Sequence, residues 1–365
     1  MFSKKSALAT LLASAMALSL AACGSNGTAS GSAASGSAAS GSATSGSAAA
    51  SSAAASTDGA KVGQTVLKCS FNQSIDNPEA KTVLELSDKL YDATDGRYSI
   101  EIYPNEQLGA QKESLELVES GAVEMAIVAN SLVENVNPDF AIIGCPYVYD
   151  SVEHQQKVFQ SGALDDLYAT TESAGFSVLA AYSLGPRCVY AKKPVTSPAD
   201  LAGMKIRVMQ SDTMVQMMNK MGGVGTPMGQ GDVYSAIQAG TLDGAENNII
   251  TYTDLKQYEV APYFSETNHL MIPDELIINT NLLKGMSEED QKALRDVSTE
   301  SVNTMFTLAS QLRDEYYAKC QNELGVTITK VDITPFQDNL KDFIQEVANR
   351  SDMTKTIYAA IQAQR

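Results

Sequence analysis

Residues 287–325 read SEEDQKALRDVSTESVNTMFTLASQLRDEYYAKCQNELG, a stretch with the spacing of one long amphipathic helix. It begins with a serine and, three positions on, an aspartate, a typical N-terminal cap, and it ends at Gly325. Between them an apolar stripe runs from Leu294 to Tyr316. At about 1.5 Å per residue the helix would be roughly 55 Å long. Because that exceeds one small domain, we expect it to run across two. Two helices broken near STES are the alternative.

From Gln64 onward, segments with strand-like and helix-like patterns alternate. These patterns predict strands at 65–71, 98–104, 123–129, 175–183 and 242–248, and helices from Pro78 to the Asp-Gly pair 95–96 and near 111–120. Such alternation is typical of an open, mostly parallel sheet, in which ligands bind at the carboxyl ends of the strands.

The composition excludes several classes of function. The chain has 365 residues, 44% of them hydrophobic, and a formal charge of -17, so nucleic acid is a poor candidate partner. With only two histidines, His154 and His269, a multi-histidine metal site or a Ser-His-Asp triad is hard to assemble. We therefore expect no metal, no cofactor and no catalytic residues.

The first 22 residues have the pattern of a signal peptide. Lys4 and Lys5 form a basic start, residues 6–20 are apolar, and LAAC follows at 20–23. This resembles a bacterial lipoprotein signal, which implies cleavage before Cys23 and a lipid on that cysteine. An ordinary signal peptide with a chance cysteine is the alternative.

The segment after Cys23, up to residue 60, is predicted to be a tether. Residues 24–56 are almost entirely Gly, Ser, Ala and Thr, and such a segment cannot bury enough apolar surface to order itself. Its expected end-to-end distance is roughly 30–35 Å. We thus expect an exported protein that is held by a lipid anchor on the outer side of the cell membrane.

Four further cysteines lie in the body of the chain. Their spacing resembles neither a disulfide framework nor a zinc motif. We expect buried free thiols at Cys69, Cys145, Cys188 and Cys320.

The stretch GMKIRVMQS, residues 203–211, predicts a short strand with an arginine on one face. Ile206 and Val208 point to one side of the strand, and Arg207 points to the other. Taken alone, the stretch favours a solvated face, because arginine is rarely buried without a partner.

Five stretches, in order, carry a more specific pattern: YPNEQLGAQKE (103–113), CPYVYDSVEH (145–154), LGPRCVYAKKPVTSPADLAGMKIRV (184–208), VYSAIQAGTLDGAEN (233–247) and YEVAPYFSETNH (258–269). Together they resemble the solute receptors of tripartite ATP-independent periplasmic (TRAP) transporters, the DctP family. The resemblance implies an α/β fold of two domains that close like a clamshell, as in periplasmic binding proteins, bridged by a long helix. By analogy the first domain holds 65–184 and 273–312, and the second holds 185–272 and 313–365.

The resemblance also implies a function. Family members capture organic acids and deliver them to an ion-driven membrane permease, without being enzymes themselves. We expect a monomer whose partners are a small organic acid and the permease subunits. A receptor for an ATP-driven importer is the nearest alternative, and an exported lyase or hydrolase acting on acidic sugars is a more distant one.

The family's site residues can be placed on this sequence. The carboxylate-binding arginine of the K-I/L-R-V strand matches Arg207, a second arginine in a G-x-R turn matches Arg187, and an asparagine in D-G-x-E-N matches Asn247. The planar guanidinium suits this role because it donates two parallel hydrogen bonds to a carboxylate.

Other positions are expected to set the specificity. Asn72, Gln73 and Asn130 follow predicted strands, Gln210 comes three residues after Arg207, and Gln230 and Asp232 lie in PMGQGDVY, where many relatives have an aromatic and an acidic residue. The segment that starts at Asn130 lacks the charged residues of sialic-acid receptors, which disfavours that ligand. Amides both donate and accept hydrogen bonds and so match hydroxyl groups. We therefore expect a hexuronate or aldonate, ahead of a C4-dicarboxylate.

Overall fold

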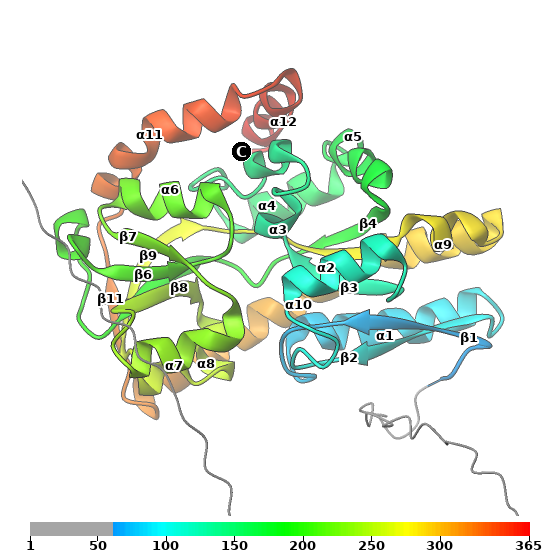
Figure 1. Cartoon of the computed structure of the whole chain (residues 1–365), viewed down its shortest axis with the longest axis horizontal. Helices are drawn as coiled ribbons and strands as arrows, with labels where there is room; N and C mark the ends of the chain where they lie inside the picture. The colour runs from blue at the N-terminus through cyan, green and yellow to red at the C-terminus, as the bar shows by residue number, and fades with distance from the viewer. Residues whose placement is uncertain (1–60) are drawn as a thin grey trace, which may run out of the picture. The chain divides into compact units, whose positions relative to one another are not determined.

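The computed structural model describes residues 61–365, and within them the strands form two sheets (Figure 1). The expected signal peptide, the expected lipid anchor on Cys23 and the expected tether lie outside the described residues. None of the helices in residues 61–365 is long and apolar enough to cross a membrane.

The first sheet has five strands. β1 is parallel to β2 and β3, whereas β10 is antiparallel to β3 and β4. In spatial order they are β2 (Tyr98–Tyr103), β1 (Thr65–Ser70), β3 (Met125–Ala129), β10 (Asp274–Asn279) and β4 (Phe176–Tyr182).

The second sheet has six strands. β5 is antiparallel to both of its neighbours, and the other pairs are parallel. In spatial order they are β11 (Thr327–Lys330), β9 (Tyr263–Leu270), β5 (Arg187–Ala191), β8 (Gly244–Asn248), β6 (Lys205–Val208) and β7 (Val224–Pro227).

The expectation of mostly parallel strands is confirmed with one exception in each sheet: β10 runs opposite to the other strands of the first sheet, and β5 runs opposite to those of the second. The chain passes from the first sheet to the second after β4 and returns after β9. β5 and β10 thus each begin at a crossing. Their first residues lie beside the last residues of neighbouring strands, with Arg187 opposite Asn248 and Asp274 opposite Ala129. Polar residues at the starts of β5 and β10 therefore lie next to residues at the ends of neighbouring strands.

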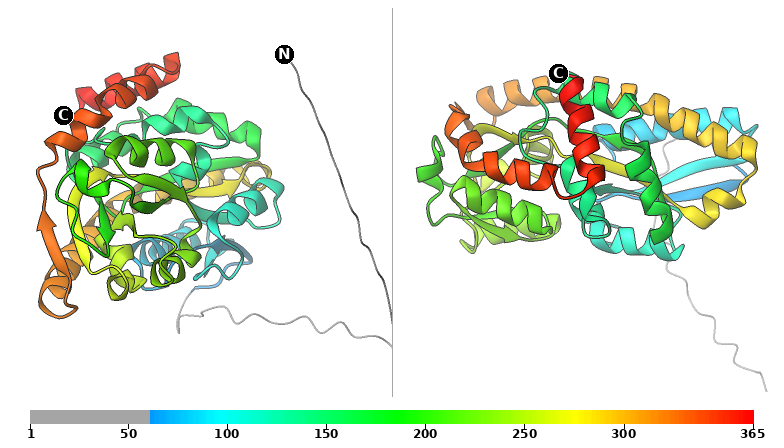
Figure 2. Two further views of the ribbon diagram at one scale, coloured as in Figure 1. Left: turned by 60° about the vertical axis from the view of Figure 1, so that its left-hand side comes forward. Right: turned by 90° about the horizontal axis from the view of Figure 1, so that it is seen from above.

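The long helix α10 (Glu288–Asn322) is a single helix of 35 residues, which contradicts the alternative of two broken helices. Ser287 caps it by accepting a hydrogen bond from the Asp290 amide, and Gly325 after its end has a positive φ of 69°. α10 packs against α1 and β4 on the side of the first sheet and against α8 and β11 on the side of the second. It therefore bridges the two sheets (Figure 2, right, orange).

Shorter helices cover the sheets. α1 starts at a proline with Asn77 as its cap, and it ends before two residues with positive φ, Asp95 and Gly96. The α-helices that precede α10 are α1 (Pro78–Ala93), α2 (Gln111–Ser120), α3 (Asn130–Val133), α4 (Val152–Gln160), α5 (Asp165–Ala169), α6 (Asp212–Met221), α7 (Val233–Gln238), α8 (Ile249–Asp254) and α9 (Thr280–Gly285). The 3₁₀ helices are η1 (Pro138–Ile142), η2 (Thr170–Ala174), η3 (Pro198–Leu201), η4 (Gln230–Asp232) and η5 (Gln257–Glu259).

Two C-terminal helices, α11 (Thr334–Ala348) and α12 (Asp352–Ala363), were not predicted. α11 packs against α6 and β9, which belong with the second sheet, but α12 packs against η1, which follows β3 of the first sheet. The Ile361 carbonyl of α12 lies 2.8 Å from His154 Nε2 of α4. The chain end therefore contacts both sides, and the expected domain boundaries stay a prediction.

The two apolar cores contain the four cysteines of the described chain. Cys69, Cys145, Cys188 and Cys320 are free and buried, as expected. Burial raises the pKa of the Cys69 and Cys188 thiols to about 12. These thiols are therefore uncharged and act as small apolar side chains.

Candidate ligand-binding site

A cavity, which we call the inner chamber, lies where the strand ends of both sheets meet. Its empty space is about 580 Å³, part of it open to solvent. We call one side the arginine wall; it comes from the second sheet and its loops and comprises Arg187, Arg207, Gln230 and Asn247. We call the other side the acid wall; it comes from the first sheet and its loops and comprises Asn72, Gln73, Glu106 and Asp274.

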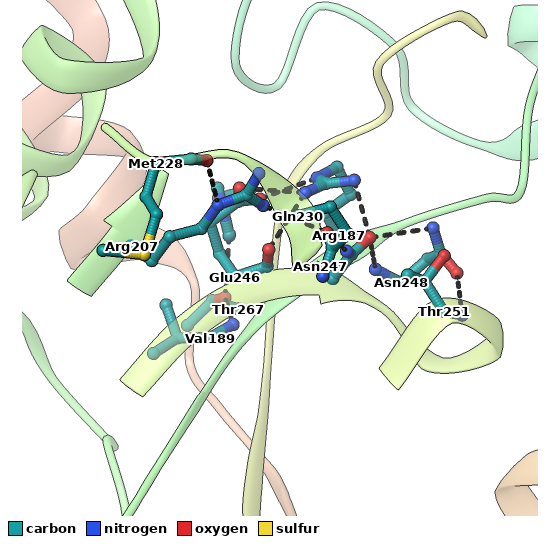
Figure 3. A network of polar contacts seen from close by, with 11 residues as sticks. Arg187, Val189, Arg207, Met228, Gln230, Glu246, Asn247, Asn248, Thr251 and Thr267 are labelled. Carbon is teal, nitrogen blue, oxygen red and sulfur yellow. Dashed lines mark hydrogen bonds and ion pairs between the residues drawn. The ribbon is translucent and has the colours of Figure 1, made fainter. Parts of the chain in front are cut away.

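Arg187 of the arginine wall forms an ion pair with the buried carboxylate of Glu246. Its Nε and Nη2 donate to the two carboxylate oxygens of Glu246 at 2.7 and 2.9 Å, and its Nη1 donates to Asn247 Oδ1 at 2.7 Å (Figure 3). Glu246 is fully buried; burial raises its pKa, but Arg187 and His269 outweigh this effect and lower it to about 2. Glu246 is therefore ionised and neutralises Arg187.

Arg207, only 4% exposed, has no carboxylate partner among the described residues. Its Nε donates to the Met228 carbonyl at 2.8 Å and its Nη1 to Gln230 Oε1 at 3.3 Å, whereas its Nη2 has no partner in the described chain. Burial lowers its pKa to about 10, which leaves it charged at neutral pH. The solvated-face interpretation was wrong. The arginine wall carries one uncompensated positive charge with free donors, the arrangement that binds a carboxylate.

Amides link the two arginines into one network (Figure 3). Gln230 Oε1 accepts from Arg207 and from Asn247 Nδ2, and Asn247 Oδ1 accepts from Arg187 and from the amide of Asn248. Asn248 in turn caps α8, and Thr251 of that helix donates to Gln73 on the acid wall at 3.1 Å. The network fixes the arginine side chains and continues across to the other wall.

The carboxyl groups of the acid wall have few positive charges near them that would compensate their own charge. Asp274 starts β10 and lies beside Glu79; burial raises the pKa of Asp274 to about 6 and that of Glu79 well above its usual range. Glu106 follows β2, and burial together with nearby Asp232 raises its pKa. These groups can accept hydrogen bonds from hydroxyls, but they repel a second carboxylate.

Most of the predicted site residues line the inner chamber. They are Arg187, Arg207, Asn247, Asn72, Gln73, Gln210 and Gln230. Asn130 and Asp232 are not on its lining. The Asn130 amide points inward and donates to the Phe140 carbonyl at 2.9 Å, while its neighbour Ser131 faces the chamber. Asp232, the last residue of η4, is exposed outside it.

Three important residues were missed. Glu246 precedes the predicted Asn247, but its role depends on the antiparallel register of β5 and β8, which the sequence pattern does not reveal. Glu106 lies just after the proline that ends β2, so the rule of strand carboxyl ends could have found it. Asp274 lies at the start of a strand, a position that this rule does not cover.

The described residues contain no cluster of three or more His, Cys, Asp or Glu side chains that could hold a metal ion. The chemistry the chamber offers is recognition: a buried cation for an anionic group, and amides and carboxyls for hydroxyls.

Comparisons with known proteins agree with this geometry. The family model described as "Bacterial extracellular solute-binding protein, family 7" (DctP) matches residues 70–351. A TRAP periplasmic solute-binding protein from Anaerococcus prevotii with bound α/β-D-glucuronate is 34% identical, with a TM-score of 0.79, over 82% of this chain and 98% of that chain. One from Xanthobacter autotrophicus with bound β-D-galacturonate is 31% identical, with a TM-score of 0.77, over 81% and 99%.

A relative with a different stated ligand also matches. The C4-dicarboxylate-binding periplasmic protein DctP of Rhodobacter capsulatus is 29% identical over 293 residues, which are 78% of this chain and 87% of that protein. Similarity in sequence and fold thus extends over nearly all of the described residues.

Proposed function

The chain belongs to family 7 of the bacterial extracellular solute-binding proteins, and on this premise we propose that its ligand is a hexuronate or an aldonate. The carboxylate binds Arg207, and the sugar hydroxyls bind the amides and carboxyls around it. The receptor then delivers this acid to the ion-driven membrane permease of a TRAP transporter.

The free guanidinium edge of Arg207 is the observation that carries the proposal. Arg187 is neutralised by Glu246, so the arginine wall has one positive charge left, at Arg207, which matches one carboxylate. Met228 and Gln230 hold Arg207 in place, and Asn247, itself bonded to Arg187, holds Gln230. Asn72, Gln73 and Gln210 face the rest of the ligand. Asn130 and Asp232 have no direct part in this proposal.

The acid wall favours a monocarboxylate with hydroxyls over a dicarboxylate. A second carboxylate would face Glu106 and Asp274, whereas a hydroxyl can donate to either of them. The glucuronate and galacturonate bound by the two relatives support a hexuronate. The Rhodobacter relative keeps a C4-dicarboxylate as the second candidate.

Ligand binding drives closure in this proposal. The ligand contacts both walls at once only when the two sheets approach each other, so it binds the closed form more tightly and shifts the population toward it. The hydrogen bond between Thr251 and Gln73 is a contact of this kind across the chamber.

A thermal-shift panel tests the ligand class. Purified receptor is heated with glucuronate, galacturonate, gluconate, succinate and malate, and the sugar acids are expected to raise the melting temperature because they bind the folded state. Stabilisation by succinate or malate alone would overturn the assignment. Chromatography of the incubated sugar acids checks that they are released unaltered, as expected of a receptor.

We also propose that residues 1–22 are removed, that Cys23 carries the lipid, and that the receptor is a tethered monomer. The sequence pattern at 20–23 supports this. Cys23→Ser should move the protein from the membrane fraction to the soluble fraction, and light scattering of the released body should give the mass of one chain. A Cys23→Ser protein that stays with the membrane would contradict the anchor.

A further inference from the structure

A second cavity adjoins the inner chamber. This outer chamber has about 610 Å³ of empty space, part of it open to solvent, and it shares Asn72, Glu106 and Gln230 with the inner one. On its far side lie Tyr234 of α7 and Gln257 of η5. The two cavities therefore adjoin each other at the three shared residues.

The outer chamber contains a buried polar group without a partner. Gln257 is 2% exposed, and its Oε1 is buried with no hydrogen bond to any described residue. At the boundary, Asn72 Oδ1 and Gln230 Nε2 are likewise buried and unpartnered. Buried polar atoms almost always have partners, so such a group in a cavity wall points to a polar ligand. The residues at the boundary line both chambers, but Gln257 lines only the outer one.

Tyr234 gives the outer chamber a fixed aromatic surface. Its hydroxyl donates to Glu259 Oε2 at 2.7 Å, which holds the ring on the wall. A sugar ring has one face of C–H groups, and an aromatic ring covers such a face while leaving the hydroxyls at the edge free to bond.

The charge around this chamber is negative. Glu106 lies at the boundary, Asp232 is close enough to raise the pKa of Glu106, and Glu259 holds Tyr234. A second anionic group placed here would be repelled. The surroundings favour an uncharged, hydroxyl-rich unit.

We propose that the receptor takes a disaccharide, with a uronate unit in the inner chamber and a neutral sugar unit in the outer chamber against Tyr234 and Gln257. This inference rests on the proposed function, because Arg207 still anchors the carboxylate. The neutral unit donates a hydroxyl hydrogen bond to Gln257 Oε1. The glycosidic link passes between Asn72, Glu106 and Gln230.

Calorimetry with three ligands tests the proposal: D-glucuronate, an aldobiouronate (glucuronate linked to a xylose), and digalacturonate. The wild-type receptor is expected to bind the aldobiouronate about tenfold more tightly than glucuronate. Tyr234→Ala should remove most of that difference and leave glucuronate binding unchanged. Tyr258→Ala is the matched control, because Tyr258 lies next to Gln257 in η5 but lines neither chamber.

The outcomes separate this inference from the proposed function. If glucuronate binds and the aldobiouronate binds more weakly, or if Tyr234→Ala changes neither ligand, the second subsite is overturned while the proposed function stands. Tighter binding of digalacturonate than of the aldobiouronate would overturn the neutral unit. If no uronate binds, the proposed function fails and this inference fails with it. Thermal melts of each variant confirm that it is folded.

Discussion

The arginine wall and the acid wall of the inner chamber differ in how their charged groups are held. On the arginine wall, Arg187 is bonded to Glu246 and Asn247, and Arg207 is held by Met228 and Gln230. On the acid wall, Asn72 Oδ1 has no partner in the described chain, and burial raises the pKa of Asp274 and Glu106.

This difference separates two tasks. A carboxylate is the group that every candidate ligand shares, and a guanidinium already fixed in position loses little freedom when it binds one. The groups still unpaired on the acid wall can respond to whatever follows the carboxylate. We infer that the arginine wall provides affinity and the acid wall provides selectivity. The predictions below test that division, beginning with the largest expected effect.

Glu246→Gln is expected to destabilise the fold most. The change leaves the buried Arg187 without its counter-charge, and breaking a buried ion pair in this way costs about 3–5 kcal/mol of unfolding free energy. Urea denaturation measures it. The control is Asp296→Asn in the exposed Lys292–Asp296 pair, where we expect less than about 1 kcal/mol. Equal losses of unfolding free energy in the two variants would mean that the fold does not depend on Glu246 as the counter-charge of Arg187.

Arg207→Ala should do the reverse, weakening binding but not the fold. Truncating one partner of a buried charge pair with the ligand costs about 2–5 kcal/mol of binding free energy. The stability of the unliganded receptor should not fall, because Arg207 has no carboxylate partner to leave behind. Calorimetry with glucuronate measures the loss. Arg313→Ala on α10 serves as a control outside the chamber. If Arg207→Ala changed the affinity by less than about threefold, Arg207 would be excluded as the anchor.

The fate of these residues shows what the sequence could reveal. Arg207 could be predicted because a charge inside a short apolar strand and a family motif coincide at one position. The long helix could be predicted because its cap, its apolar stripe and its end are all local. Glu246 could not, since its partner is 59 residues away and the two meet only through the antiparallel pairing of β5 with β8.

The errors on the acid wall have a common cause. Asp274 was missed because the alternating pattern implied parallel strands, in which a strand start lies far from the site. Asn130 was expected in the chamber because it follows β3, but strand position does not determine where a side chain turns, and its amide bonds to Phe140 instead. Strand order and side-chain direction come from long-range packing, which local periodicity does not encode.

Glu134→Gln tests whether the two sides also hold together without a ligand. Glu134 follows α3, beside the first sheet, and accepts a hydrogen bond from Thr213 at the start of α6, beside the second sheet. Next to it, Asn135 donates to the Gln210 carbonyl at 2.9 Å. Losing the carboxylate should open the unliganded receptor and weaken ligand binding by about 1 kcal/mol. X-ray scattering reports the opening and calorimetry the affinity. Glu153→Gln, at the start of α4, is the control, and unchanged scattering and affinity would argue against the contact.

The smallest expected effect is a pH dependence that arises from the acid wall. Burial raises the pKa of Asp274 to about 6, so the side chain is charged at pH 7.5 and largely protonated at pH 5.5. Glu79, Glu106, Glu275 and Arg187 are the ionisable groups around it. A sugar acid, with a pKa of about 3.5, keeps its carboxylate over this range. Acidification therefore removes a repulsive charge near the ligand, and affinity should rise about threefold.

Calorimetry at pH 5.5, 6.5 and 7.5 measures this rise, and Asp274→Asn should flatten it. The same residue has a consequence for stability: because its pKa is raised above the usual 3.8, the folded state binds the proton more tightly than the unfolded chain does. The contribution of Asp274 to the unfolding free energy therefore falls as the pH rises from about 4 to 6, and Asp274→Asn should remove that slope. If affinity instead fell on acidification, the charged form of Asp274 would be the one that binds a ligand hydroxyl, and the acid wall would contribute to affinity as the arginine wall does.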